Sequence, residues 1–110
     1  MYATIDRDTL KQKLDAHEDF HLVEVLAERE FNRLHINGAE HIQFGQIAKE
    51  ANKRFDKEDC IVVYCADTEC KASPIAAKKL DTLGYTNVYD FEGGKTAWQE
   101  AGYPMQGTEA

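Results

Sequence analysis

The amino-acid sequence predicts an α/β domain built around a largely parallel β-sheet. Segments of strand character alternate with segments of helical character along the chain, and no internal repeat, low-complexity tract or Pro- or Gly-rich linker interrupts them. Such alternation is typical of βαβ units. At 110 residues the chain can bury one core but not two. We therefore expect a single domain over residues 1–110, with residues 105–110 frayed.

The first half of the chain alternates short strands with helices. Residues 4–5 have the character of an edge strand. Asp8 and Thr9 offer caps for a helix through Leu10 and Leu14, which are spaced i, i+4. Further strands are expected at residues 21–25 and 40–42, and further helices at residues 28–34 and 47–55.

The second half of the chain contains the strongest strand signal, at residues 60–65. This run is almost wholly apolar, which is the pattern of a central strand that is buried on both faces. A helix is expected next, with Pro74 in its first turn and Gly84 as its stop. A last strand at residues 87–91 leads through a glycine pair at 93–94 into a final helix.

The charge balance argues against several classes of partner. The chain carries 20 acidic and 13 basic residues, a net charge of −7, and its basic residues form no cluster. This disfavours nucleic acid or an anionic membrane surface as a partner. No apolar run approaches the ~20 residues of a membrane span, and the N-terminus lacks the pattern of a signal peptide. An odd cysteine count of three favours a reducing cytoplasm over a disulfide scaffold.

The most informative residue is Cys65, which ends the apolar run Ile-Val-Val-Tyr-Cys. A polar loop follows it, and then a helix begins. A cysteine between a strand and a helix can use backbone N–H groups and the positive end of the helix dipole to stabilise a thiolate. We expect its thiol at the mouth of a pocket. A buried core cysteine is the structural alternative, because free cysteine is often buried.

Several motifs occur together and in order along the chain. They are Leu22-Val23-Glu24-Val25 with Glu30-Phe31, His35-Ile36-Asn37-Gly38-Ala39, Val62-Val63-Tyr64-Cys65, and Leu83-Gly84-Tyr85 followed by Glu92-Gly93-Gly94 and Ala97-Trp98. Each motif alone is weak, but their order and spacing resemble the rhodanese-like (sulfurtransferase) domain over almost the whole chain. The resemblance implies a three-layer fold, in which helices flank a five-stranded, mostly parallel sheet.

Active members of this family carry sulfane sulfur on a loop cysteine. The resemblance implies that Cys65 takes sulfur from thiosulfate, a persulfide or a polysulfide, and passes it from its own persulfide to cyanide or to a thiol, including a protein thiol. It also implies an active loop whose backbone N–H groups hold the outer sulfur, formed by Ala66, Asp67, Thr68, Glu69, Cys70 and Lys71. Converging N–H donors suffice for a persulfide anion, so we expect no metal and no cofactor.

The sequence departs from the usual family pattern around this active loop. Residues 24–26 read Glu-Val-Leu where Asp-Val-Arg is common, and Ala66 stands where arginine often follows the cysteine. Asp67 and Glu69 add negative charge close to Cys65. An anionic loop disfavours a dianionic donor, unless both acids point into solvent and are screened. We therefore expect a persulfide or polysulfide donor to be preferred over thiosulfate.

Other chemistry stays open for the active loop. The Cys65-x5-Lys71 spacing is similar to that of cysteine phosphatases, although lysine lacks the planar fork that binds phosphate. Cys70 could resolve a persulfide or sulfenic acid on Cys65, or it could only pack the loop. A metal site is less favoured, because the C-x4-C pair has no second pair of ligands. A non-catalytic regulatory or binding module on the same fold is a further alternative, and Cys60 is expected in the core.

Overall fold

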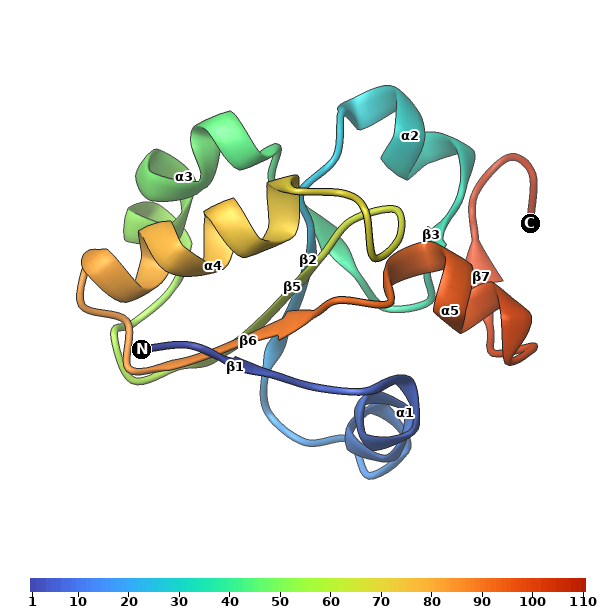
Figure 1. Cartoon of the computed structure of the whole chain (residues 1–110), viewed down its shortest axis with the longest axis horizontal. Coiled ribbons are helices and arrows are strands. Elements are labelled where there is room, and N and C mark those ends of the chain that lie inside the picture. Colours follow the sequence, from blue (N-terminus) through green and yellow to red (C-terminus); the bar gives the residue numbers. More distant parts are fainter.

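Five parallel strands form the central sheet, in the order β1-β6-β5-β2-β4 (Figure 1). A computed structural model describes all of residues 1–110. The strands are β1 (Ala3–Thr4), β2 (His21–Glu24), β4 (Glu40–His41), β5 (Cys60–Tyr64) and β6 (Asn87–Phe91). Each neighbouring pair runs parallel. The predicted α/β fold with a five-stranded parallel sheet is therefore confirmed.

Helices cover both faces of this sheet. They are α1 (Arg7–Asp15), α2 (Glu28–Arg33), α3 (Ile47–Arg54), α4 (Ala72–Thr82) and α5 (Gly94–Glu100), with a short 3-10 helix η1 (Phe44–Gln46) before α3. Figure 1 shows α3 and α4 together on one side of the sheet and α1 on the other. No helix is both long enough and apolar enough to cross a membrane.

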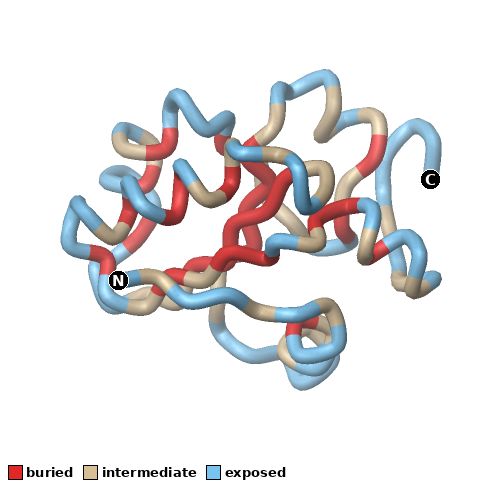
Figure 2. The backbone as a smooth tube through the Cα atoms, in the orientation of Figure 1, coloured by how far each residue is buried: buried red, intermediate tan, exposed pale blue.

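The central strand β5 is apolar on both of its faces. Ile61 and Val63 belong to a core cluster with residues of α3 and α4. Val62 and Tyr64 belong to a second cluster, on the side of α1 and α5. All of these side chains are fully buried, and the buried residues concentrate along the middle of the sheet (Figure 2). Because successive side chains point to opposite faces, only a near-continuous apolar run suits this position.

The helix termini follow local capping chemistry, with one difference from the prediction. Asp6, and not Asp8, caps α1, and its carboxylate accepts a hydrogen bond from the Thr9 N–H at 2.8 Å. The backbone is extended at Asp6, as an N-cap requires, whereas Asp8 already lies in the first helical turn. As predicted, α4 has Pro74 in its first turn and ends before Gly84, which adopts a φ of 98°.

The C-terminal residues pair with the chain instead of fraying as we expected. Strand β7 (Met105–Gln106) lies antiparallel to β3 (His35–Ile36) in a separate two-stranded sheet. Beyond it, the Thr108 and Glu109 N–H groups donate to carbonyl oxygens at the end of α2, at 3.1 and 3.0 Å. These backbone bonds attach the last residues to β3 and to the end of α2.

Candidate active site

Cys65 directly follows β5, at the carboxyl edge of the sheet where parallel sheets commonly bind ligands. The strand's last carbonyl, that of Tyr64, accepts the Val25 N–H at 3.1 Å and so holds this edge to the neighbouring segment after β2. Cys65 itself is only 1% exposed. We expected its thiol at the mouth of a pocket, and the structure instead buries it in the core cluster that contains residues of α3 and α4.

A disulfide between Cys65 and Cys70 closes the active loop. The two Cα atoms are 6.3 Å apart, within the range that a disulfide spans. Cys70 is partly buried and packs against the same core cluster that contains Cys65. The structure therefore shows the oxidised form of the cysteine pair, in which neither sulfur is a free thiolate.

The Asp67 side chain turns back into the active loop. Its Oδ1 accepts hydrogen bonds from the N–H groups of Glu69 and Cys70, at 3.0 and 3.1 Å. The Asp67 carbonyl oxygen also accepts the Cys70 N–H, at 3.2 Å. Glu69 and Lys71 are exposed. The two acids of the loop thus differ, because one organises the loop backbone and the other faces solvent.

The rest of the active-loop backbone keeps its hydrogen-bond donors free. The N–H groups that donate to no acceptor in the protein are those of Ala66, Asp67, Thr68 and Lys71. Helix α4 starts immediately after the loop and has no acidic residue in its first turn. No carboxylate of its own first turn therefore offsets the positive end of this helix. Free N–H groups beside a helix N-terminus form a surface that favours an anion.

Helix α5 holds the start of the active loop through the backbone. The N–H groups of Lys95 and Thr96 donate to the carbonyl oxygens of Cys65 and Ala66, each at 3.0 Å. Gly94 has a φ of 60°, and a Cβ atom there would overlap the Cys65 carbonyl oxygen. Gly94 of the motif's glycine pair is therefore required for the close approach between α5 and the cysteine.

A buried ion pair lies beside this contact. Lys95 Nζ is 2.9 Å from Glu24 Oε2, and the side chains are 7% and 0% exposed. The Tyr64 hydroxyl donates to Glu24 Oε1 at 2.9 Å and accepts the Ile36 N–H at 3.1 Å. Lys95 Nζ also donates to the Glu30 carbonyl oxygen at 2.8 Å. Burial raises the pKa of Glu24, while Lys95 and Tyr64 oppose that rise by stabilising the carboxylate.

A second polar contact lies on the α4 side of Cys65. Ser73, in the first turn of α4, places its Oγ 3.4 Å from Cys65 Sγ. Asp90 of β6 is opposite Val63 in the sheet and only 1% exposed. Burial raises the pKa of Asp90, and a hydrogen bond with Ser73 opposes the rise. Two buried polar side chains thus extend inward from the cysteine.

Sequence reasoning does not identify Lys95, Ser73 or Asp90 as neighbours of Cys65. A single acid in an apolar strand, as at Glu24, does signal that a buried partner must exist, because an unpaired buried charge is costly. The sequence cannot say which distant residue supplies that partner.

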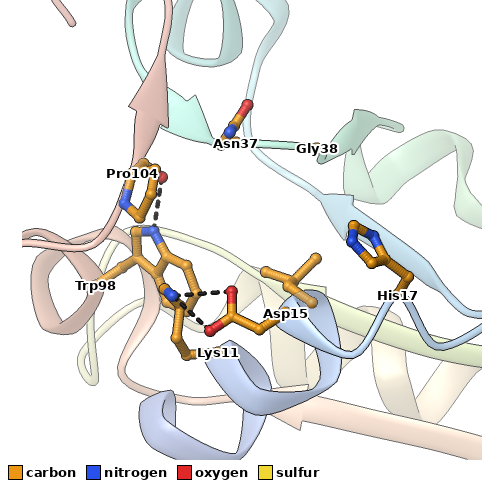
Figure 3. Close-up of a pocket in the computed structure, with 8 residues that line it drawn as sticks. Lys11, Asp15, His17, Asn37, Gly38, Trp98 and Pro104 are labelled. Carbon is orange, nitrogen blue, oxygen red and sulfur yellow. Dashed lines mark hydrogen bonds and ion pairs between the residues drawn. The ribbon is translucent and has the colours of Figure 1, made fainter.

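Other features of the surface lie away from the active loop. A pocket of about 330 Å³ is lined by residues of α1, the Asn37-Gly38 turn and the segment around Trp98, and by none of residues 65–71 (Figure 3). Cys60 is a free, partly buried thiol at the opposite end of β5, and burial raises its pKa. No group of three or more His, Cys, Asp or Glu side chains is arranged to hold a metal ion.

Comparisons with known sequences agree on one protein family. The rhodanese-like domain family matches this chain over residues 6–101. YtwF of Bacillus subtilis, provisionally named a sulfurtransferase, is 33% identical over 95 residues, covering 86% of this chain and 88% of YtwF. YrkF of the same organism, provisionally named a sulfur carrier protein, is 29% identical over 94 residues, or 86% of this chain. The chain spans about half of YrkF, 49% of its length.

Solved structures share the fold. The rhodanese-like domain of the Alr3790 protein from Anabaena sp. has a TM-score of 0.89 at 28% identity, covering 99% of this chain and 82% of that one. A thiosulfate sulfurtransferase from Pseudomonas aeruginosa has a TM-score of 0.86 at 25% identity, covering 96% of this chain and 20% of that one. From the family match, the sheet topology and the ordered motifs, we conclude that this chain belongs to the rhodanese-like domain family.

Proposed function

We propose that the reduced chain is a sulfurtransferase that carries sulfane sulfur as a persulfide on Cys65. The Cys65 thiolate attacks the outer sulfur of the donor, whose S–S bond breaks and releases a thiolate, or sulfite in the case of thiosulfate. A thiol or cyanide acceptor then attacks the outer sulfur and restores the Cys65 thiolate. Family membership and the names of the relatives support sulfur transfer as the general class of activity.

The position of Cys65 is the observation that carries this proposal. The cysteine follows the central strand, and the free N–H groups of the active loop and the start of α4 surround the same edge of the sheet. A persulfide anion gains stability from such donors without a metal or a general base. The backbone hydrogen bonds that Lys95 and Thr96 of α5 donate to Cys65 and Ala66 hold the cysteine next to these donors.

Sulfur transfer to cyanide tests the proposal. All variants are made in the Cys70→Ser background, so that the disulfide of the structure cannot re-form. The protein is first reduced with a thiol, which is removed before a persulfide donor and cyanide are added, and thiocyanate is then measured. We expect Cys65→Ser to abolish thiocyanate formation. Cys60→Ser is the matched control, because Cys60 lies at the other end of β5, and this variant should keep its activity. A Cys65→Ser variant with undiminished transfer would contradict the assignment.

The second part of the proposal concerns the donor. Asp67 lies within the active loop and its carboxylate is bonded to two loop N–H groups, so its charge stays close to the proposed sulfur site. At ~6 Å and an effective dielectric of ~20, one pair of unit charges interacts by about 3 kcal/mol before salt screening. A dianionic donor such as thiosulfate is therefore disfavoured relative to a persulfide or polysulfide.

The substitution Asp67→Asn isolates this charge, because an asparagine Oδ1 can still accept both loop N–H groups. We expect kcat/KM for thiosulfate to rise, by about tenfold for each 1.4 kcal/mol of repulsion removed, with a smaller change for a persulfide donor. Glu69→Gln is the control, since Glu69 is exposed. Equal effects of Asp67→Asn on both donors would show that the loop charge does not select the donor.

A further inference from the structure

The disulfide joins the proposed sulfur carrier to a second cysteine in its own loop. Cys70 is held beside Cys65 by its packing against the core cluster and by the two bonds that its N–H makes to Asp67. The 6.3 Å separation of the Cα atoms lets the sulfurs bond directly. Cys70 is therefore placed to react with whatever is attached to the Cys65 sulfur.

We propose that Cys70 resolves the Cys65 persulfide and releases its outer sulfur as sulfide, which makes the chain a persulfide reductase. This inference rests on the proposed Cys65 persulfide. The Cys70 thiolate attacks Cys65 Sγ, the S–S bond of the persulfide breaks, and the outer sulfur leaves with a proton as hydrosulfide. The new bond is the Cys65–Cys70 disulfide of the structure.

The electrons of this step balance without a metal or a cofactor. The outer sulfur is reduced to sulfide, and the two cysteines are oxidised to the disulfide. A low-molecular-weight thiol then reduces that disulfide by exchange, becomes a disulfide itself, and returns both cysteines to the thiol state. One persulfide and two thiol equivalents are consumed in each cycle.

Two features of the chain favour Cys70 for this role over the third cysteine. Cys60 lies at the start of β5, about 16 Å from Cys65 along an extended strand, so it cannot reach the persulfide. Cys70 lies in the active loop, is bonded to Cys65 in the structure, and is less buried than Cys65.

A single-turnover experiment tests the inference. The fully reduced protein, freed of thiol, is mixed anaerobically with a limiting amount of glutathione persulfide, and sulfide, intact mass and free thiols are measured. For the unaltered chain we expect an equimolar release of sulfide, and a fall from three free thiols to one in the chains that react. The product should have lost two hydrogen atoms and should carry no extra sulfur.

The variant Cys70→Ser separates this inference from the proposed function. We expect it to keep the added sulfur on Cys65 and to release little sulfide, whereas Cys60→Ser should behave like the unaltered chain. If the unaltered chain keeps a stable persulfide and forms no disulfide, or if Cys70→Ser releases sulfide equally well, the inference is wrong and the proposed function stands. If Cys70→Ser takes up no sulfur at all, the proposed function fails as well.

Discussion

Replacing Lys95 by methionine should destabilise the fold through the buried charge that it leaves behind. Lys95 Nζ and Glu24 Oε2 are 2.9 Å apart, and both side chains are almost completely buried. At an effective dielectric of ~20 their attraction is about 6 kcal/mol, which offsets the cost of removing both charges from water. Methionine retains much of the packing volume, so Lys95→Met removes mainly the charge and the donor.

The expected loss follows from what Glu24 can do without its partner. Glu24 can take up a proton, which at pH 7 costs about 3.4 kcal/mol from the ordinary glutamate pKa of 4.5, at about 1.4 kcal/mol per pKa unit. The Glu30 carbonyl oxygen also loses its bond from Nζ, worth about 1 kcal/mol. We therefore expect Lys95→Met to lower the free energy of unfolding by roughly 3–5 kcal/mol, the range measured for broken buried pairs.

Urea unfolding at several pH values measures this effect. The destabilisation should shrink as the pH falls toward 5, because protonating Glu24 then costs only about 0.7 kcal/mol. Adding Glu24→Gln to Lys95→Met should restore part of the stability at neutral pH, since the unpaired charge is gone and an acceptor for Tyr64 is kept.

An exposed ion pair provides the control. Lys53 Nζ is 3.7 Å from Glu50 Oε2, with the side chains 59% and 25% exposed, so Lys53→Met should cost at most about 0.5 kcal/mol. If Lys95→Met costs no more than this control, or if its cost does not depend on pH, the buried pair does not stabilise the fold as argued.

Two further predictions concern the close approach of Gly94 to the Cys65 backbone and the buried carboxylate of Asp90. Gly94→Ala should destabilise the chain by at least about 2 kcal/mol, because its Cβ would overlap the Cys65 carbonyl oxygen at a positive φ. Gly45→Ala, where a Cβ meets nothing within 4 Å, should be nearly neutral in the same urea titration. Asp90→Asn should stabilise the fold at neutral pH. Because burial raises the pKa of Asp90 in the folded state, its contribution is favourable at low pH and is lost as the pH rises through that raised pKa. The difference between Asp90→Asn and the unaltered chain should disappear near the unfolded value of 3.8, and lower stability of the variant at neutral pH would contradict this reasoning.

The sequence predicts those parts of the molecule that depend on local pattern. The apolar run before Cys65 suits only a strand buried on both faces, and β5 is the centre of the sheet. Pro74 and Gly84 bound α4 as predicted, because each residue type restricts its own backbone. The α1 cap is harder to assign from sequence, since two aspartates precede the apolar residues and both suit a helix start.

The remaining features depend on contacts between distant segments. The partner of Glu24 lies in α5, and the partner of β7 lies near α2, so neither pairing leaves a local pattern. The spacing of Cys65 and Cys70 suggests a thiol pair, yet only the loop conformation set by Asp67 brings the two sulfurs together. Cys65 is buried in the core cluster that contains residues of α3 and α4, so its thiol is not at a pocket mouth as we expected.

The most direct test of the central claim is to locate the transferred sulfur. Reduced Cys70→Ser protein, in which the resolving thiol is absent, is incubated with a persulfide donor and alkylated. Its peptides are then measured by mass spectrometry. Our account predicts that the mass of one sulfur atom is added to the peptide that contains Cys65, and that none is added in the double variant Cys65→Ser/Cys70→Ser. Sulfur found on Cys60, or on no cysteine, would contradict it.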